Sequence, residues 1–162
     1  MKLRQHIIIG GVGMAVLYFH WGLSRALLFW GAEVLIDADH YWDYLWRSKF
    51  KDWSARRMFR FCDLITARLY DKNFLGFSLL HTAEVFTAVY LLARYFNHTF
   101  FITIFYGMLF HLMLDMLSLA YRKRFFVRAY SIIEYWIRKK AMIHHGLKPD
   151  EFYKEIFRLS DK

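Results

Sequence analysis

The chain has very little cysteine and very little proline. Cys62 is the only cysteine among 162 residues, so no internal disulfide can form and a zinc site built from cysteine thiolates is excluded. Pro149 is the only proline, and there are eight glycines, which favours long helices over a loop-rich or disordered chain. The length fits a single domain, 1–162, rather than two.

Apolar residues and positive charge are both abundant. Hydrophobic residues make up 57% of the chain, while 23 Lys and Arg against 14 Asp and Glu give a formal charge of +9. Such a chain must separate its apolar surface from its charges, and a lipid bilayer is the usual reason for doing so. A soluble basic domain that binds nucleic acid is the less favoured alternative, because the charges flank the apolar runs and do not face them.

Four apolar stretches predict membrane-embedded helices: 7–19, 26–36, 74–96 and 99–120. The last two are long enough to cross a hydrocarbon core of about 30 Å at a rise of about 1.5 Å per residue. The first two are shorter, so we expect them to tilt, to thin the bilayer or to re-enter it. The predicted fold is all-α, an integral membrane bundle of about four helices in two hairpins, 7–40 and 74–120.

The positive charges predict the orientation. All Lys and Arg except Arg25 and Arg94 lie in the N-terminus, the 41–73 connection and the 121–162 tail. The positive-inside rule places these segments, and both termini, in the cytoplasm of a multi-pass inner (plasma) membrane protein. A cleaved signal peptide is the alternative for the start of the chain.

The connection and the tail alternate aromatic and basic residues, as in Tyr41 to Arg57 and Ser131 to Lys140. Amphipathic aromatics favour the headgroup level, and Lys and Arg favour anionic lipid phosphates. We therefore expect amphipathic helices at the membrane interface, with a folded cytosolic cap as the alternative.

Ionisable side chains interrupt the apolar stretches, where a central charge costs about 2.5–3.5 kcal/mol on insertion scales. The expected topology brings them to the cytoplasmic ends of all four helices. The candidate metal ligands are His6, Asp37, Asp39, His40, His81, Glu84, His111 and Asp115. His20 and His98 belong to the opposite membrane face and are excluded.

Helical spacing pairs several of these candidates. His81 and Glu84 are three residues apart, and His111 and Asp115 are four apart, so each pair projects from one helix face. Neutral imidazole and carboxylate suit zinc first, with manganese or iron as alternatives, and one to three ions. A single histidine in such a helix is more often an interhelical hydrogen-bonding group, but the convergence of four segments favours a cation.

The motifs resemble those of prokaryotic inner-membrane proteins described as predicted metal-dependent hydrolases, some of them labelled LexA-binding. The resemblance covers residues 6 to about 130. It rests on an early His, an Asp-x-Asp-His run, a His that opens a helix and a His-x-x-x-Asp pair: His6, Asp37 to His40, His81, and His111 with Asp115. A looser similarity to the zinc-dependent phospholipase C group is analogy only.

One motif departs from that family, whose third motif often carries two histidines. The first of these positions is Gly76 here, and only the second survives, as His81. Glu84 is the residue that could compensate as a ligand, so metal number and substrate are open.

The resemblance and the ligand set imply a membrane-bound metal-dependent hydrolase. We expect it to act on a phosphoester or lipid-like substrate at the cytoplasmic membrane face, with Asp39 or Glu84 as general base. Membrane lipids are the expected partners, and nucleic acid is disfavoured. The alternatives are a non-catalytic metal-binding protein, or a membrane anchor that binds a partner through its basic aromatic segments.

Overall fold

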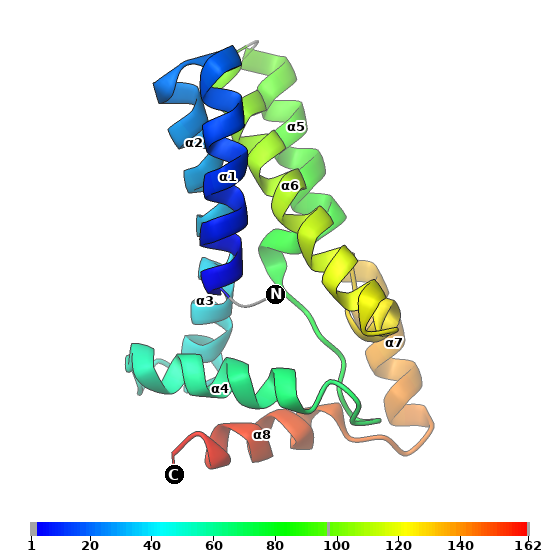
Figure 1. The fold of residues 1–162 in the computed structure, drawn as a ribbon. Helices are drawn as coiled ribbons and strands as arrows, with labels where there is room; N and C mark the ends of the chain where they lie inside the picture. Colours follow the sequence, from blue (N-terminus) through cyan, green and yellow to red (C-terminus); the bar gives the residue numbers. More distant parts are fainter. Residues whose placement is uncertain (1–2, 97, 162) are drawn as a thin grey trace. The chain divides into compact units, whose positions relative to one another are not determined.

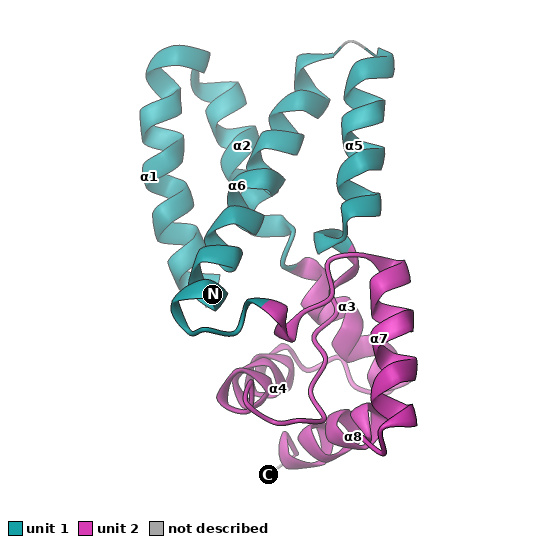
Figure 2. Ribbon diagram, turned by 90° about the vertical axis from the view of Figure 1, so that its right-hand side faces the viewer, with its two compact units in different colours: residues 1–37, 80–125 teal, residues 38–79, 126–162 magenta. Residues whose placement is uncertain are grey.

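The structure is a computed structural model that describes residues 3–96 and 98–161. Within these ranges every regular element is a helix, and the one β-bridge joins Gly76 to Arg128 without forming a strand. The all-α prediction is therefore confirmed. The chain divides into two compact units, residues 1–37 with 80–125 and residues 38–79 with 126–162 (Figure 2).

Unit 1 contains four helices: α1 (Leu3–Trp21), α2 (Leu23–Leu35), α5 (Ala83–Phe96) and α6 (Thr99–Tyr121). Helix α2 packs against both α1 and α6, and α5 packs against α6. The end of α1 and the start of α2 lie at the same end of the unit as the end of α5 and the start of α6 (Figure 1). The start of α1, the end of α2 and the start of α5 consequently share the other end, and α6 runs past them.

The contact between α2 and α6 is close because α6 has a glycine there. A Cβ atom at Gly107 would lie 2.4 Å from the backbone oxygen of Phe29 and 3.0 Å from the Cβ of Ala32. No side chain fits this gap, so Gly107 lets the two helix backbones approach each other. This approach brings the polar residues of α2 next to those of α6.

The third apolar stretch differs from its prediction. Residues 74–96 were expected to form one helix, but α5 begins only at Ala83, after a 3₁₀ turn at Leu79–His81. The Gly76 amide donates to the Val127 oxygen and the Ala129 amide donates to the Gly76 oxygen, both at 2.9 Å. Because these bonds hold the segment extended, an apolar composition alone did not make it helical.

The number of predicted membrane crossings also needs correction. Among the described helices, only α6 is both long and apolar enough to cross a membrane. Helices α2 and α5 have 13 and 14 residues, which at about 1.5 Å per residue span about 20 Å. A bundle with four full crossings is therefore not supported.

Unit 2 contains the amphipathic helices expected in the connection and the tail: α3 (Ala38–Arg47), α4 (Ala55–Ala67), α7 (Ile132–His144) and α8 (Pro149–Leu159). Buried aromatic and aliphatic side chains from α3, α4 and α8 form its core, together with Phe74. The Tyr153 hydroxyl donates to the Leu75 oxygen at 2.7 Å, and the Arg47 guanidinium stacks on the Tyr153 ring at 3.5 Å from its centroid. These contacts connect α3 and α8 with the extended segment before α5.

The turn between α3 and α4 is organised by Asp52. Its Oδ2 accepts the Tyr44 hydroxyl at 2.6 Å, its Oδ1 accepts the Ser54 amide at 2.8 Å, and Arg57 donates to the same carboxylate. The hydrogen bond from Tyr44, followed by that from the Ser54 amide, holds the pKa of Asp52 below its usual value.

Candidate metal centre

Five of the eight predicted ligands lie together in unit 1. His6 comes from α1, Asp37 follows the last residues of α2, His81 ends the 3₁₀ turn before α5, and His111 with Asp115 comes from α6. All are buried except Asp37, whose side chain is 14% exposed. Three packed helices and one turn thus place imidazoles and carboxylates in a shared interior.

Two histidines from the first and last helices of the unit stack on each other. The rings of His6 and His111 lie 3.8 Å apart with 13° between their planes. The Nε2 atom of His6 is 3.2 Å from Asp115 Oδ1, and the Nε2 atom of His111 is 3.9 Å from Asp115 Oδ2. One ligand atom from each of these residues lies within 4.8 Å of the others, close enough for a shared cation.

A second group of ligands uses the same histidine. His111 Nε2 lies 3.4 Å from Asp37 Oδ1, and His81 Nε2 lies 3.8 Å from the same oxygen. Ligand atoms of these three residues also lie within 4.8 Å of one another. His111 therefore belongs to both groups, and because its Nε2 has one lone pair it can ligate a single ion.

The hydrogen bonding of His111 determines which of its nitrogens is available. Its Nδ1 lies 2.7 Å from the backbone oxygen of Glu33, which can only accept, so Nδ1 must carry the proton. The Nε2 lone pair of the neutral ring then faces the carboxylates of Asp37 and Asp115. Within the described chain this buried Nε2 forms no hydrogen bond. A cation at this position would give the buried Nε2 a partner.

Asp39 and His40 are part of neither ligand group. They belong to unit 2, where His40 Nδ1 lies 3.7 Å from Asp39 Oδ1 and 3.5 Å from Ser78 Oγ, and Arg128 donates to the same hydroxyl at 2.9 Å. Glu84 lies in the first turn of α5 and is half-buried. The two metal groups found among the described residues include none of these predicted ligands.

For Glu33 the sequence left two roles open, a partner of the metal ligands or a residue that lines the helix interior. Its side chain is fully buried, with Oε1 2.9 Å from His6 Nδ1 and 3.7 Å from His111 Nδ1. The signal was present, since Glu33 is the one acidic residue inside the 26–36 apolar stretch. Of the two excluded histidines, His98 caps α6 by accepting the Phe100 amide, and His20 lies in the last turn of α1, away from His6.

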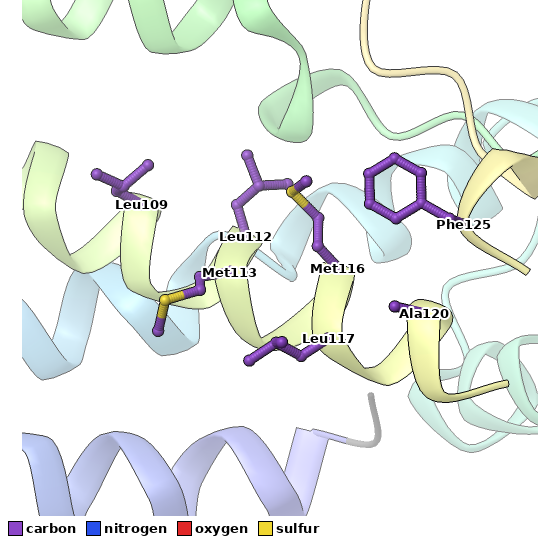
Figure 3. Close-up of a pocket in the computed structure, with 7 residues that line it drawn as sticks. All are labelled: Leu109, Leu112, Met113, Met116, Leu117, Ala120 and Phe125. Atoms are coloured by element: carbon purple, nitrogen blue, oxygen red, sulfur yellow. The ribbon is translucent and has the colours of Figure 1, made fainter. Parts of the chain in front are cut away.

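An apolar hollow of about 290 Å³ lies on a different face of α6 (Figure 3). Its lining is Leu109, Leu112, Met113, Met116, Leu117, Ala120 and Phe125. At about 100° per residue, His111 and Asp115 lie on the opposite side of the helix from this stripe. Helix α6 thus has a polar face toward the cluster and an apolar face away from it.

Comparison with known proteins gives no relative: no protein-family model, no curated protein and no solved structure matches the chain. The resemblance to predicted inner-membrane hydrolases therefore stays a prediction that rests on the motifs alone.

Proposed function

We propose that this chain is a membrane-embedded, metal-dependent hydrolase acting on an amphipathic phosphoester or lipid-like substrate. The observation that supports it most is the buried His111 Nε2, which faces two carboxylates without a hydrogen bond. A buried cluster of imidazoles and carboxylates is costly unless a cation compensates its charge.

The donor set fits a divalent transition metal. Two or three imidazole nitrogens with one or two carboxylates suit zinc, and they also admit manganese or iron. One ligand group consists of His111, His81 and Asp37. The other consists of the same His111 with His6 and Asp115. Such an ion supplies Lewis acidity and favours deprotonation of water near neutral pH.

Asp37 is the residue that we assign to contact with substrate and water. It is the partly exposed member of the cluster, whereas the side chains of His81 and His111 are fully buried. One oxygen of its carboxylate would bind the metal with His81 and His111, and the other could accept a proton from water. This assignment takes the general-base role from Asp39 and Glu84, which lie outside both metal groups.

The outer surface of unit 1 supports a membrane location. Large apolar side chains are exposed on all four of its helices, among them Val12 at 62%, Leu27 at 45%, Leu91 at 58% and Leu117 at 59%. The buried interior, in contrast, contains histidines and carboxylates. Ionisable side chains buried beside apolar ones such as Phe86 and Met108, under an apolar outer surface, are unusual in a soluble bundle. We propose that this surface contacts lipid, with the bilayer thinned around the short α2 and α5.

The substrate class follows from this location. A cluster at the membrane-embedded ends of α1, α2 and α5 is reached most directly by a molecule that is itself at the membrane. The exposed apolar side chains of unit 1, and not the hollow on the far side of α6 (Figure 3), would contact the acyl chains of such a molecule. A phosphoester with an apolar tail combines the two requirements. The cytoplasmic orientation of the basic segments stays a prediction from the positive-inside rule.

The test is a hydrolysis assay on detergent-purified protein. Lipid and water-soluble phosphoesters are offered with added Zn²⁺ or Mn²⁺ to the wild type, to Asp37→Asn and to Glu151→Gln, an exposed carboxylate in α8. We expect turnover in the wild type and the Glu151 variant and a loss of at least 10²-fold in Asp37→Asn, the scale of general-base catalysis. Equal turnover in all three would contradict the proposal.

A second candidate is a non-catalytic anchor, which one surface of unit 2 favours. Lys49 and Phe50 both have positive φ, 53° and 57°, so the chain turns sharply after α3 and Phe50 contacts the rings of Trp42 and Trp46. Trp42, Trp46 and Trp53 are 56–68% exposed, and Lys49 and Lys51 are exposed beside them. Tryptophan with lysine is typical of a surface that binds anionic headgroups.

The anchor reading is tested by fluorescence in reconstituted bilayers. Brominated phosphatidylserine should quench the tryptophans more than brominated phosphatidylcholine does, and Lys49→Gln/Lys51→Gln should remove that difference. A protein that shows this quenching but binds no metal and hydrolyses nothing is an anchor. Quenching that is independent of lipid charge would remove this candidate.

A further inference from the structure

Glu33 is a residue of α2 that contacts both of the stacked histidines, His6 and His111. It is on α2, which packs against α1 and α6, the helices of His6 and His111. Its side chain has no exposure to solvent, and its Oε2 forms no hydrogen bond within the described chain. A fully buried carboxylate at this position needs a role that repays its desolvation.

Glu33 contacts both histidines, but through different atoms. Its side-chain Oε1 lies 2.9 Å from His6 Nδ1, and its backbone oxygen lies 2.7 Å from His111 Nδ1. Both Nδ1 atoms therefore face Glu33, and both Nε2 atoms face the carboxylate of Asp115. The stacked arrangement of the rings is what allows one residue to reach both.

The contacts of the two rings determine where a metal could bind. The backbone carbonyl can only accept, so His111 Nδ1 donates to Glu33 and His111 Nε2 keeps a lone pair. Both ring nitrogens of His6 face carboxylates, Glu33 Oε1 at 2.9 Å and Asp115 Oδ1 at 3.2 Å, so a metal at His6 Nε2 would require the proton on Nδ1, toward Glu33. Ligating histidines usually donate their other ring nitrogen to such a carboxylate or carbonyl, which orients the ring and raises its basicity. We propose that Glu33 is a positioning residue of the metal centre: its carboxylate presents Nε2 of His6 to the metal, beside His111, which its backbone oxygen orients.

Helix α1 is adapted to the Glu33 side chain one turn after His6. A Cβ atom at Gly10 would lie 2.3 Å from Glu33 Oε2 and 2.8 Å from its Cδ. The Glu33 carboxylate thus occupies the space that a side chain at position 10 would take. Gly10→Ala should displace this carboxylate and loosen its contact with His6, without altering any ligand.

This inference rests on the proposed metal-dependent function, and a cobalt titration tests it. Co²⁺ binding to detergent-purified full-length protein is followed by visible absorption in the wild type, Glu33→Ala, Glu33→Gln, Gly10→Ala and Glu151→Gln. We expect 10–100-fold weaker binding and an altered spectrum in Glu33→Ala, the usual effect of removing such a partner. Glu33→Gln keeps an accepting oxygen and should restore most of the affinity, and Glu151→Gln should match the wild type.

The outcomes distinguish the role of Glu33 from the existence of the metal centre. If the wild type binds Co²⁺ and both Glu33→Ala and Gly10→Ala bind it with the same affinity and spectrum, the inference about Glu33 is wrong while the metal centre stands. If the wild type binds no Co²⁺, both are wrong. Should Glu33→Ala fail to fold by circular dichroism, Glu33→Gln and Gly10→Ala decide: a wild-type spectrum in Gly10→Ala overturns the role of Glu33.

Discussion

The imidazole rings of His6 and His111 stack face to face, with their centroids 3.8 Å apart. They come from α1 and α6, which contact each other far less than each contacts α2. Glu33, on the helix between them, bonds to both rings. The ring pair is thus a property of three helices packed together, and disturbing any one of them should disturb the metal centre.

Gly107 should be necessary for that packing. Gly107→Ala places a Cβ 2.4 Å from the Phe29 oxygen, and overpacking of this kind costs about 1–3 kcal/mol. We expect a lower thermal unfolding midpoint in detergent and weaker metal binding. Gly31→Ala, which meets no atom within 4 Å, is the matched control and should be neutral or slightly stabilising. Equal stability of the two variants would show that α2 and α6 are less closely packed than described.

His81 and His40 should differ in their effect on bound metal. His81 shares a ligand group with Asp37 and His111, whereas His40 pairs with Asp39 and Ser78 in unit 2. We expect His81→Ala to lose metal by elemental analysis and His40→Ala to retain the wild-type content. Loss of metal in His40→Ala would return His40 to the ligand set that the sequence predicted.

Asp52 should stabilise unit 2 in a pH-dependent way. Its pKa is lowered in the folded state, chiefly by the Tyr44 hydrogen bond, so its contribution is present above the pKa of the unfolded chain. The contribution is lost as pH falls through the lower folded pKa. Hydrogen exchange in α3 and α4 should therefore be faster in Asp52→Asn than in the wild type near pH 7, with the difference shrinking below about pH 4. A difference that does not change with pH would contradict this role.

The sequence predicted the helical class and much of the cluster because the relevant signals are local. The apolar run at 99–120 became α6 almost without change, and His111 with Asp115 project together as their spacing requires. The helix predicted at 74–96 begins only at Ala83 in the structure. The Gly76 amide bonds to the Val127 oxygen, some fifty positions later, and no local pattern reveals such a contact.

The sequence could not separate ligands from their neighbours. Asp37, Asp39 and His40 are adjacent in the chain, yet Asp37 joins unit 1 while the other two join unit 2. For Glu33 the sequence could not choose between a partner of the ligands and a residue lining the interior, and the packing of α2 against α1 and α6 places it beside two histidines. These distinctions depend on tertiary contacts between helices that are distant in the sequence.

The most direct test of the account is the metal content of detergent-purified protein, wild type beside His111→Ala. His111 belongs to both ligand groups, so its loss removes a donor from either. We predict zinc, manganese or iron at one equivalent or more in the wild type and a large loss in the variant. No metal in either protein, even after reconstitution with excess ions, would contradict the account and leave a buried polar network that packs the helices.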